Sequence, residues 1–444
     1  MEEFIRMLTE QIRCVKARDG VAKEYVNHIH DQAECYEKRG LSHEVAIEMA
    51  VKEMGDPVAI GMELDHIHRP KTDWKMLMLV VLLSIAGIVV QYITGVLDIS
   101  HGRLGNQCLY MIIGLLAMFG IYFLDYSFIG KYAKLLYWGM FLAYFVYTNL
   151  WAETIYGQAR CMVMPSYLFI PVYAGILYQY RGQSYMAIVK SILYMIPAVF
   201  FCFFFIPSLP TAFNLLVIMS CMLALAIWKG WFQLNRIKTF VCLFIVEVVF
   251  PILSVVYLYY FKMTDYQQFR IQSFFHILNG TGDANFLNQR ANAMIMGSNW
   301  IGASVEMTDN MYQLMQSSGF ILTQLVAAYG VLFGIMIILA FIALLSHMFR
   351  ITWRQKNQLG FMIGAGCGLI FFVSILEGVF MNVGLFPYTT INIPFLTYGG
   401  SATCFYDIIL GLLLSVYRYQ NIVSDKTFKT KWKISLKVEK AMKE

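Results

Sequence analysis

The stretch MNVGLFPYTTINIPFLTYGGSATCFYDIILGLLL, residues 381–414, decides the fold of this chain. It ends one long apolar segment and begins another, and glycine and proline interrupt the loop between them. The loop closes with Pro-Phe-Leu-Thr-Tyr-Gly-Gly-Ser at the entry to the last apolar segment. Apolar segments of about 20 residues are long enough to cross a bilayer as helices. The stretch therefore predicts two membrane-spanning helices joined by a short, shaped loop.

The whole chain has the composition of a membrane protein. Of its 444 residues, 59% are hydrophobic and 14% are charged, whereas soluble domains carry about 25% charged residues. The net charge of +6 comes mainly from short loops and the tail, so it indicates orientation rather than a nucleic-acid partner. The nine cysteines are scattered without a CxxC pair, and we interpret them as packing residues.

From Lys75 onward, successive apolar runs predict an all-α polytopic membrane protein with about ten transmembrane helices. We place these helices at 75–94, 108–125, 131–150, 164–180, 186–206, 210–228, 238–261, 319–345, 359–383 and 398–417. Alternate loops are rich in Lys and Arg, and the loops between them are poor in both. Because cytoplasmic loops carry the basic residues, both termini are expected in the cytoplasm of a multi-pass protein.

The domain boundaries follow from changes in composition. Residues 1–72 are rich in charge and amphipathic, and they predict a small cytoplasmic domain of three or four helices. Residues 73–420 form the predicted membrane domain, in which residues 262–318 make one large extracytoplasmic loop. Residues 421–444 form a basic cytoplasmic tail. We interpret four histidines of the first domain as solvated side chains rather than metal ligands: His28, His30, His66 and His68.

The phrase from Pro394 to Ser401 resembles the C-terminal signature of the SEDS family, the FtsW, RodA and SpoVE proteins of bacterial wall synthesis. The resemblance covers residues 75–420, and the first domain separately resembles a "permease prefix" domain. Membership implies peptidoglycan assembly in the bacterial plasma membrane, with lipid II polymerised by glycosyl transfer on the outer face. It also implies substrate-binding roles for the residues around the signature turn: Tyr398, Gly399, Gly400 and Ser401.

The same resemblance assigns a catalytic residue in the large loop. Asp283, followed by Gly297-Ser298 and Gly302, matches the positions that follow the essential Asp of the family. A carboxylate there would act as general base on the attacking sugar hydroxyl, or would hold a divalent cation, so the cofactor stays open. The alternative is that Asp283 only begins a Gly-Asp-Ala-Asn turn. Three arginines are candidates for binding the pyrophosphate: Arg160, Arg270 and Arg290.

The chain departs from the family where charged residues are expected. Gly157, Ala159, Arg160, Pro165 and Ser166 fit a family segment, but Tyr167 replaces its Glu and Ile170 stands near the place of its Lys. The segment SSGFILTQLVAA, residues 317–328, carries none of the acids usual there. These losses predict a divergent member whose catalytic competence is open.

Three acids lie inside predicted spans, where charge is costly and each is a functional candidate: Glu247, Glu377 and Asp407. We expect Glu377 to line a cavity for a lipid headgroup and Asp407 to serve helix packing beside Gly399 and Gly400. For Glu247, a structural role and a functional role both stay open.

Two other functions remain alternatives to polymerisation. A carrier would move or bind the lipid-linked precursor without chemistry, and the lost acids suit it. A non-catalytic scaffold would receive a signal at residues 1–72 and bind a partner through its spans. Besides lipid II and membrane lipid, the family resemblance implies a single-span class B penicillin-binding transpeptidase as partner.

Overall fold

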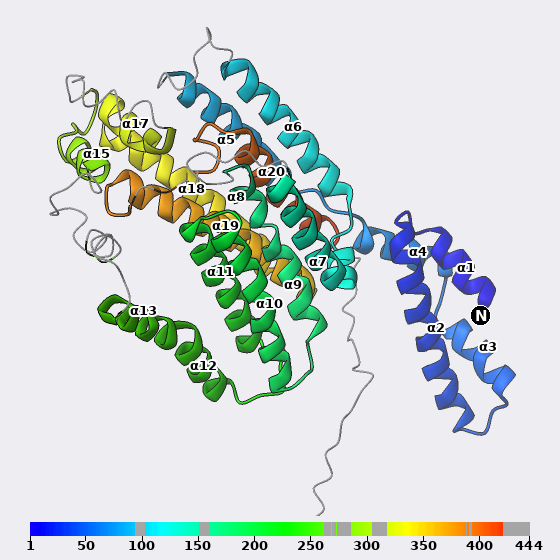
Figure 1. Ribbon diagram of the computed structural model, residues 1–444. Helices are drawn as coiled ribbons and strands as arrows, with labels where there is room; N and C mark the ends of the chain where they lie inside the picture. The colour runs from blue at the N-terminus through cyan, green and yellow to red at the C-terminus, as the bar shows by residue number, and fades with distance from the viewer. Residues whose placement is uncertain are drawn as a thin grey trace, which may run out of the picture. The chain divides into compact units, whose positions relative to one another are not determined.

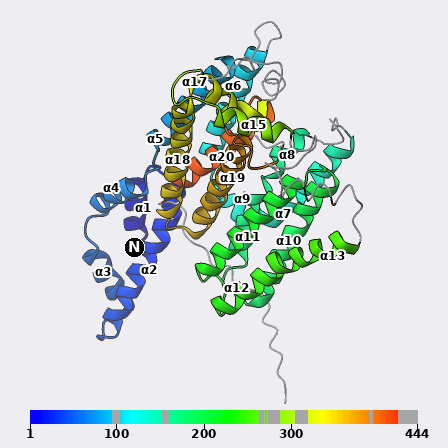
Figure 2. The ribbon, with the colours of Figure 1, turned by 90° about the vertical axis from the view of Figure 1, so that its left-hand side faces the viewer.

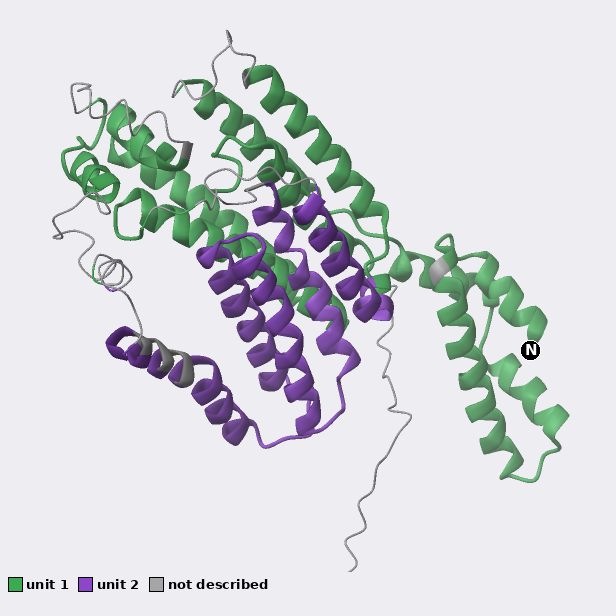
Figure 3. Ribbon diagram, in the orientation of Figure 1, with its two compact units in different colours: residues 1–128, 272–425 green, residues 129–271, 426–444 purple. Residues whose placement is uncertain are grey.

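The structure is a computed structural model that describes residues 1–93, 103–150, 160–261, 286–303, 318–387 and 393–420, with single residues at 268, 272 and 389. Every secondary-structure element in these ranges is helical (Figure 1; Figure 2), which confirms the all-α prediction for the described chain. The helices divide into two compact units. Unit 1 holds residues 1–128 and 272–425, and unit 2 holds residues 129–271 and 426–444 (Figure 3).

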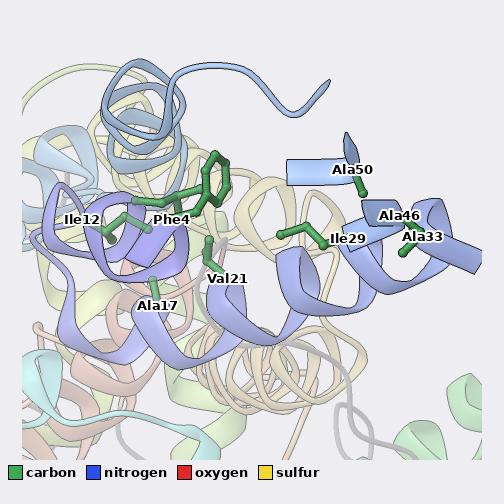
Figure 4. Close-up of a cluster of buried hydrophobic side chains, with 9 residues drawn as sticks. Phe4, Ile12, Ala17, Val21, Ile29, Ala33, Ala46 and Ala50 are labelled. Carbon is green, nitrogen blue, oxygen red and sulfur yellow. The ribbon is translucent and has the colours of Figure 1, made fainter. Parts of the chain in front are cut away.

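Four helices begin unit 1: α1 (Glu2–Glu10), α2 (Val15–Glu37), α3 (His43–Glu53) and α4 (Pro57–His68). Their boundaries follow local signals in the sequence. Asp56 caps α4 by accepting the N–H groups of Val58 and Ala59, and Pro57 takes the first helical position. Ile12 and Ile29 are fully buried in the core that these helices share (Figure 4). Four helices therefore bury one apolar cluster, as the amphipathic pattern predicted.

Asp65 fastens α4 to the turn between α1 and α2. Its Oδ1 accepts the backbone N–H of Arg13 at 2.8 Å, and its Oδ2 accepts from Arg69 Nη2 at 3.1 Å. The Arg13 backbone bond, followed by the two guanidinium groups, holds the pKa of this carboxyl below its usual range. The bond therefore stabilises the folded state above pH about 4 and loses that contribution as the pH falls through the lowered pKa.

Six further helices of unit 1 lie in its predicted membrane domain. They are α5 (Trp74–Ile93), α6 (Arg103–Phe123), α17 (Ile321–Tyr329), α18 (Val331–Trp353), α19 (Gln358–Asn382) and α20 (Gly400–Arg418). α20 packs along α6 because small residues allow the backbones to approach. A Cβ at Gly411 would lie 2.6 Å from the Met118 carbonyl oxygen, and one at Gly114 would overlap the buried carboxylate of Asp407. The structure places Asp407 at this helix contact, against Gly114 of α6 and not beside Gly399 and Gly400, and its packing role stays a prediction.

The eighth predicted span, 319–345, is wrong in its boundaries. The apolar run is divided at Gly330, whose φ of 97° ends α17 and starts α18, so the long helix covers Val331–Trp353. Only glycine fits there, since a Cβ would lie 2.7 Å from the carbonyl oxygen of Trp300. The break depends on a segment distant in sequence, which hydropathy does not detect.

The linker between α4 and α5 is bound to three other elements of unit 1. The Lys71 N–H donates to the Arg418 carbonyl at 3.2 Å. The hydroxyls of Thr72 and Tyr122 lie 2.6 Å apart, and Asp73 Oδ2 lies 2.8 Å from His347 Nε2. Asp73 also accepts the Met76 N–H and so starts α5. The first predicted span is thus fixed to the ends of α6, α18 and α20.

Unit 2 contains these described helices: α7 (Ser127–Leu150), which starts in unit 1, α8 (Arg160–Ser166), α9 (Phe169–Gln179), α10 (Tyr185–Phe204), α11 (Leu209–Trp228), α12 (Arg236–Phe244), the π-helix η1 (Ile245–Val249) and α13 (Phe250–Phe261). Across the described residues of both units, eight helical stretches are long and apolar enough to cross a membrane. Two further predicted spans correspond to α7 and to the run from α12 to α13, and they stay predictions.

Candidate functional site

The signature segment, residues 393–399, lies against α5 in unit 1. Phe395 has a φ of 66°, a left-handed conformation that is uncommon for a residue with a side chain. Its carbonyl oxygen accepts from Gln91 Nε2 at 3.3 Å and points at Gly87, where any Cβ would overlap it. Gly87 therefore gives the Phe395 carbonyl the space that its strained backbone requires.

Gln107 of α6 holds the other end of the signature segment. Its Oε1 accepts the Gly399 N–H at 3.4 Å, and its Nε2 donates to Thr403 Oγ1 at 3.2 Å. The Thr403 hydroxyl in turn donates to the Gly399 carbonyl at 2.9 Å. Gln107 is buried, so these bonds satisfy an amide that would otherwise be costly inside a bundle. A polar side chain of α6, which is distant in sequence, thus positions the start of α20.

Beneath the signature segment is a small pocket in unit 1. Its lining comes from α5, α6, the signature segment and α20: Ser84, Ile88, Gln107, Met111, Phe395, Thr403 and Tyr406. The enclosed space is comparable with one water molecule, whereas ligand sites for organic molecules measure about 300–1,000 Å³. The pocket is therefore a polar seam between helices, and it is too small to hold a disaccharide.

Glu377 is buried on α19 near the same seam, 7% exposed. It lies one turn beyond Ser374, which hydrogen-bonds the hydroxyl of Tyr406, and it is within electrostatic reach of that ring. Tyr406 itself lines the small pocket. A buried carboxyl beside a buried phenol is a costly arrangement in a membrane helix and indicates a specific role.

Asn382, at the end of α19, is a node that the sequence did not identify as functional. Its Nδ2 donates to the carbonyls of Gly319 (3.0 Å) and Gly378 (2.8 Å), and its Oδ1 accepts the Thr323 N–H at 3.0 Å. The Thr323 hydroxyl donates to the Asn382 carbonyl at 2.7 Å. These bonds join the start of α17 to α19 where the family acids are missing. The sequence did contain a signal for this node, because Asn382 and Thr323 are polar residues that each lie inside an apolar run.

The described part of the large loop is fixed to these helices. α15 (Phe286–Met296) donates from Asn288 Nδ2 to the Phe386 carbonyl (2.7 Å) and from Asn292 Nδ2 to the Val383 carbonyl (2.9 Å). Gly384, with a φ of 82°, lies flush against the backbone of Asn288. Farther along, the Gly302 N–H donates to the Tyr329 carbonyl at 3.0 Å. The loop therefore presents α15 on the ends of α17 and α19.

The predicted site residues occupy different environments. Arg290 is exposed on α15, 5.3 Å from the ring centroid of Phe286. Tyr398, Gly399 and Gly400 are half-buried, and Ser401 is exposed. Arg290, Glu377 and the signature residues all belong to unit 1. Three further candidates are not placed by the structure: Asp283 and Arg270 lie outside the described residues, and Arg160 begins α8 with its side chain undescribed.

Two of the departures from the family, Tyr167 and Ile170, are buried in unit 2, whereas the third, residues 317–328, belongs to unit 1. Tyr167 is 2% exposed, and its hydroxyl accepts from Asn214 Nδ2 at 3.3 Å. Ile170 is fully buried in the same turn, since its N–H donates to the Tyr167 carbonyl at 3.0 Å. Buried, uncharged side chains thus stand in the place of two charges. Within the described residues of the whole chain, no group of three or more His, Cys, Asp or Glu side chains could hold a metal ion.

The buried polar node, the shaped turn before the last helix and the apolar helices define a polytopic α-helical membrane protein. The chain belongs to the FtsW/RodA/SpoVE family, described as "Cell cycle protein", whose family model matches residues 72–422. The resemblance of the signature segment to this family is therefore confirmed.

Curated relatives agree with this family. The chain is 29% identical over 164 residues to the probable peptidoglycan glycosyltransferase FtsW of Synechocystis sp., covering 36% of this chain and 41% of that protein. It is 32% identical over 100 residues to stage V sporulation protein E of Bacillus subtilis, covering 22% of this chain and 27% of that protein. The matched regions thus span less than half the length of these curated relatives.

Solved structures share the fold. A chain from a structure on the coordination of polymerization and crosslinking by a peptidoglycan synthase complex superposes with a TM-score of 0.63 at 18% identity, covering 79% of this chain and 99% of that chain. The rod shape determining protein RodA of Thermus thermophilus gives a TM-score of 0.53 at 16% identity, covering 79% of this chain and 97% of that chain.

Proposed function

We propose that the protein polymerises lipid II, the lipid-linked disaccharide-peptide of the bacterial cell wall, at the outer face of the plasma membrane. The supporting observation is the signature segment, whose strained turn at Phe395 is held by Gly87 and Gln91 of α5. A turn that costs free energy and is nevertheless fixed by its surroundings is typical of functional sites. Relatives named as peptidoglycan glycosyltransferases support the same reaction.

The proposed reaction requires a base and a cationic site. The acceptor sugar hydroxyl attacks the anomeric carbon of the donor, and the bond from that carbon to the pyrophosphate oxygen breaks. Asp283 takes the proton of the attacking hydroxyl, and the prenyl pyrophosphate leaves with the electron pair. Arg290, exposed on the fixed helix α15, is suited to bind the leaving phosphates, and Arg160 and Arg270 are further candidates. A divalent cation would serve the same oxygens, so its requirement is part of the test.

The test is a polymerisation assay with the purified full-length protein and labelled lipid II. We expect glycan strands on a gel from the wild type and none from Asp283→Ala. Asp309→Ala removes a second acid from the same predicted loop and should keep most of the product. Repeating the assay with a chelator measures the need for a divalent cation. A wild-type protein that yields no strands with any cation supplied would contradict the proposal.

A carrier is the second candidate, and one observation favours it. Tyr167 and Ile170 are buried and neutral, so this part of unit 2 lacks the charges of the family segment. Movement of labelled lipid II across proteoliposomes without strand formation would support a carrier. Absence of both activities, with a wall-synthesis protein bound to the chain, would support the scaffold.

We further propose that both termini are cytoplasmic and that the chain works beside a single-span class B transpeptidase. The structural neighbour from a synthase complex that couples polymerization to crosslinking supports such a partner. In this arrangement, residues 1–72 form the cytoplasmic domain that receives a signal, and the linker bonds at Thr72 and Asp73 transmit it to the spans. Impermeant thiol labelling of Cys35, which is exposed on α2, tests the orientation in intact and opened cells.

A further inference from the structure

One end of unit 2 gathers lysines around a buried tyrosine. The Nζ atoms of Lys134 on α7 and Lys190 on α10 lie 4.7 Å and 6.0 Å from the ring centroid of Tyr180. Tyr194 continues the cluster, with its ring 6.4 Å from Tyr180 and 6.3 Å from Trp138. Residues near the ends of three helices, α7, α9 and α10, thus place two ammonium groups near one aromatic ring. The basic loops of the sequence lie at the same end of unit 2.

The two ammonium groups have no counter-charge in the part of the chain that the structure describes. Both lysines are exposed, and neither forms an ion pair with a described carboxylate. The described residues of unit 2 contain eight lysines and arginines and a single acid, Glu247. Both ammonium groups lie within 6.0 Å of the Tyr180 ring centroid, and the ring attracts them without supplying a negative charge. An anion bound beside the ring would neutralise both lysines.

The surface beside the lysines suits an acyl chain rather than water. On α7, Leu135 is 71% exposed and Trp138 is 49% exposed. On α10, Met186 is 69% exposed and Leu193 is 56% exposed, and both lie within one turn of Lys190. A basic pair next to an exposed apolar strip is the arrangement that binds the headgroup and the chains of one lipid. A free anion would use the lysines but not the strip.

We propose that Lys134 and Lys190, positioned by Tyr180, bind the phosphate of an anionic phospholipid whose acyl chains lie along α7 and α10. The site is separate from the signature segment of unit 1 and does not depend on whether the protein polymerises lipid II. The lipid neutralises the paired lysines and ties α7 to α10 at the membrane surface. Its role is therefore to stabilise this end of unit 2 in an anionic leaflet.

The experiment measures lipid binding to the full-length protein in detergent by native mass spectrometry and by the shift of the unfolding temperature. Phosphatidylglycerol is titrated against phosphatidylcholine and inorganic phosphate. Lys134→Gln combined with Lys190→Gln should weaken phosphatidylglycerol binding by about 25-fold, or about 5-fold per lysine. Lys131→Gln with Lys238→Gln removes the same charge from exposed positions of unit 2 and should change binding about 2-fold or less.

Two further variants keep the result interpretable. Lys134→Arg with Lys190→Arg preserves the charge and should restore binding, which shows that loss in the glutamine pair is not misfolding. Tyr180→Leu removes the ring and should weaken binding while leaving both charges. Equal loss in the two glutamine pairs, or equal stabilisation by phosphatidylcholine or inorganic phosphate, overturns the site.

Discussion

The signature region of unit 1 and the α8–α9 turn of unit 2 both match family segments, but they are held in different ways. Around Phe395, the backbone of Gly87 lies flush against the Phe395 carbonyl, and the Gln107 side chain accepts the Gly399 N–H. Around Tyr167, buried side chains fill the space, and the Tyr167 hydroxyl accepts a neutral hydrogen bond from Asn214. Close backbone approach permits few substitutions, whereas side-chain packing tolerates exchange at similar volume. The difference accounts for the retention of the family phrase around Phe395 and for its replacement at Tyr167 and Ile170.

The largest expected effect comes from breaking the backbone approach in unit 1. Gly87→Val would force a branched side chain into the Phe395 carbonyl, which cannot move without changing its strained turn. We expect a loss of about 3 kcal/mol or more in the free energy of unfolding, measured by thermal unfolding in detergent.

Gly120→Val is the control for that substitution. Gly120 lies on α6 in the same unit, and a Cβ there meets nothing within 4 Å. The control should unfold within a few degrees of the wild type, because the added side chain meets no neighbour. Both substitutions add the same atoms to a helical glycine, so the difference in stability between them measures the effect of the close approach at Gly87. If the two variants lost equal stability, helix propensity and not close approach would explain the result.

The second prediction tests whether the turn at Tyr167 and Ile170 in unit 2 can hold the two charged side chains of the family segment. Tyr167→Glu would place a carboxylate in a turn that is 2% exposed, and an unpaired buried charge costs about 3 kcal/mol. Adding Ile170→Lys, one turn away, should recover about 1 kcal/mol or more as coupling between the two sites. A double-mutant cycle on unfolding temperatures measures this coupling.

Tyr167→Phe removes only the hydroxyl and is the conservative reference. Strictly additive losses would mean that the turn cannot hold the family pair.

A third effect concerns the polar node of unit 1. Asn382→Ala would leave the Thr323 N–H and the Gly319 carbonyl buried without their partner. Unsatisfied buried groups cost about 1–3 kcal/mol each, so we expect a total loss of about 2–3 kcal/mol. Asn149→Ala is the control, because Asn149 is exposed and its side chain donates to the Phe145 carbonyl one turn back on the same helix. Hydrogen exchange at residues 318–323 should rise in the first variant and not in the second. Unchanged exchange there would show that the node is not what fixes the start of α17.

Sequence patterns predicted the helices of both units well, because long apolar runs and capping residues report local structure. They also indicated a close helix contact near Asp407, but the glycine that lies against its carboxylate is Gly114 of α6 and not Gly399 or Gly400. They missed the break at Gly330, the left-handed turn at Phe395 and the bonds of Asn382. Each of these depends on a partner far away in sequence, such as Trp300, which no local pattern contains. Asp283 remains a prediction, because it lies outside the described residues.

The smallest expected effect concerns one hydrogen bond of unit 2, from Tyr144 to the turn between α8 and α9. The Tyr144 hydroxyl donates to the Pro165 carbonyl at 3.0 Å, and that carbonyl also accepts the Leu168 N–H at 3.0 Å. Tyr144→Phe therefore leaves no acceptor unsatisfied, and the ring keeps its packing, 5.7 Å from Phe169 between centroids. We expect a loss of about 1 kcal/mol or less in the free energy of unfolding. A loss as large as that of Asn382→Ala would show that unit 2, like unit 1, depends on its polar contacts, and the contrast between the two regions would fail.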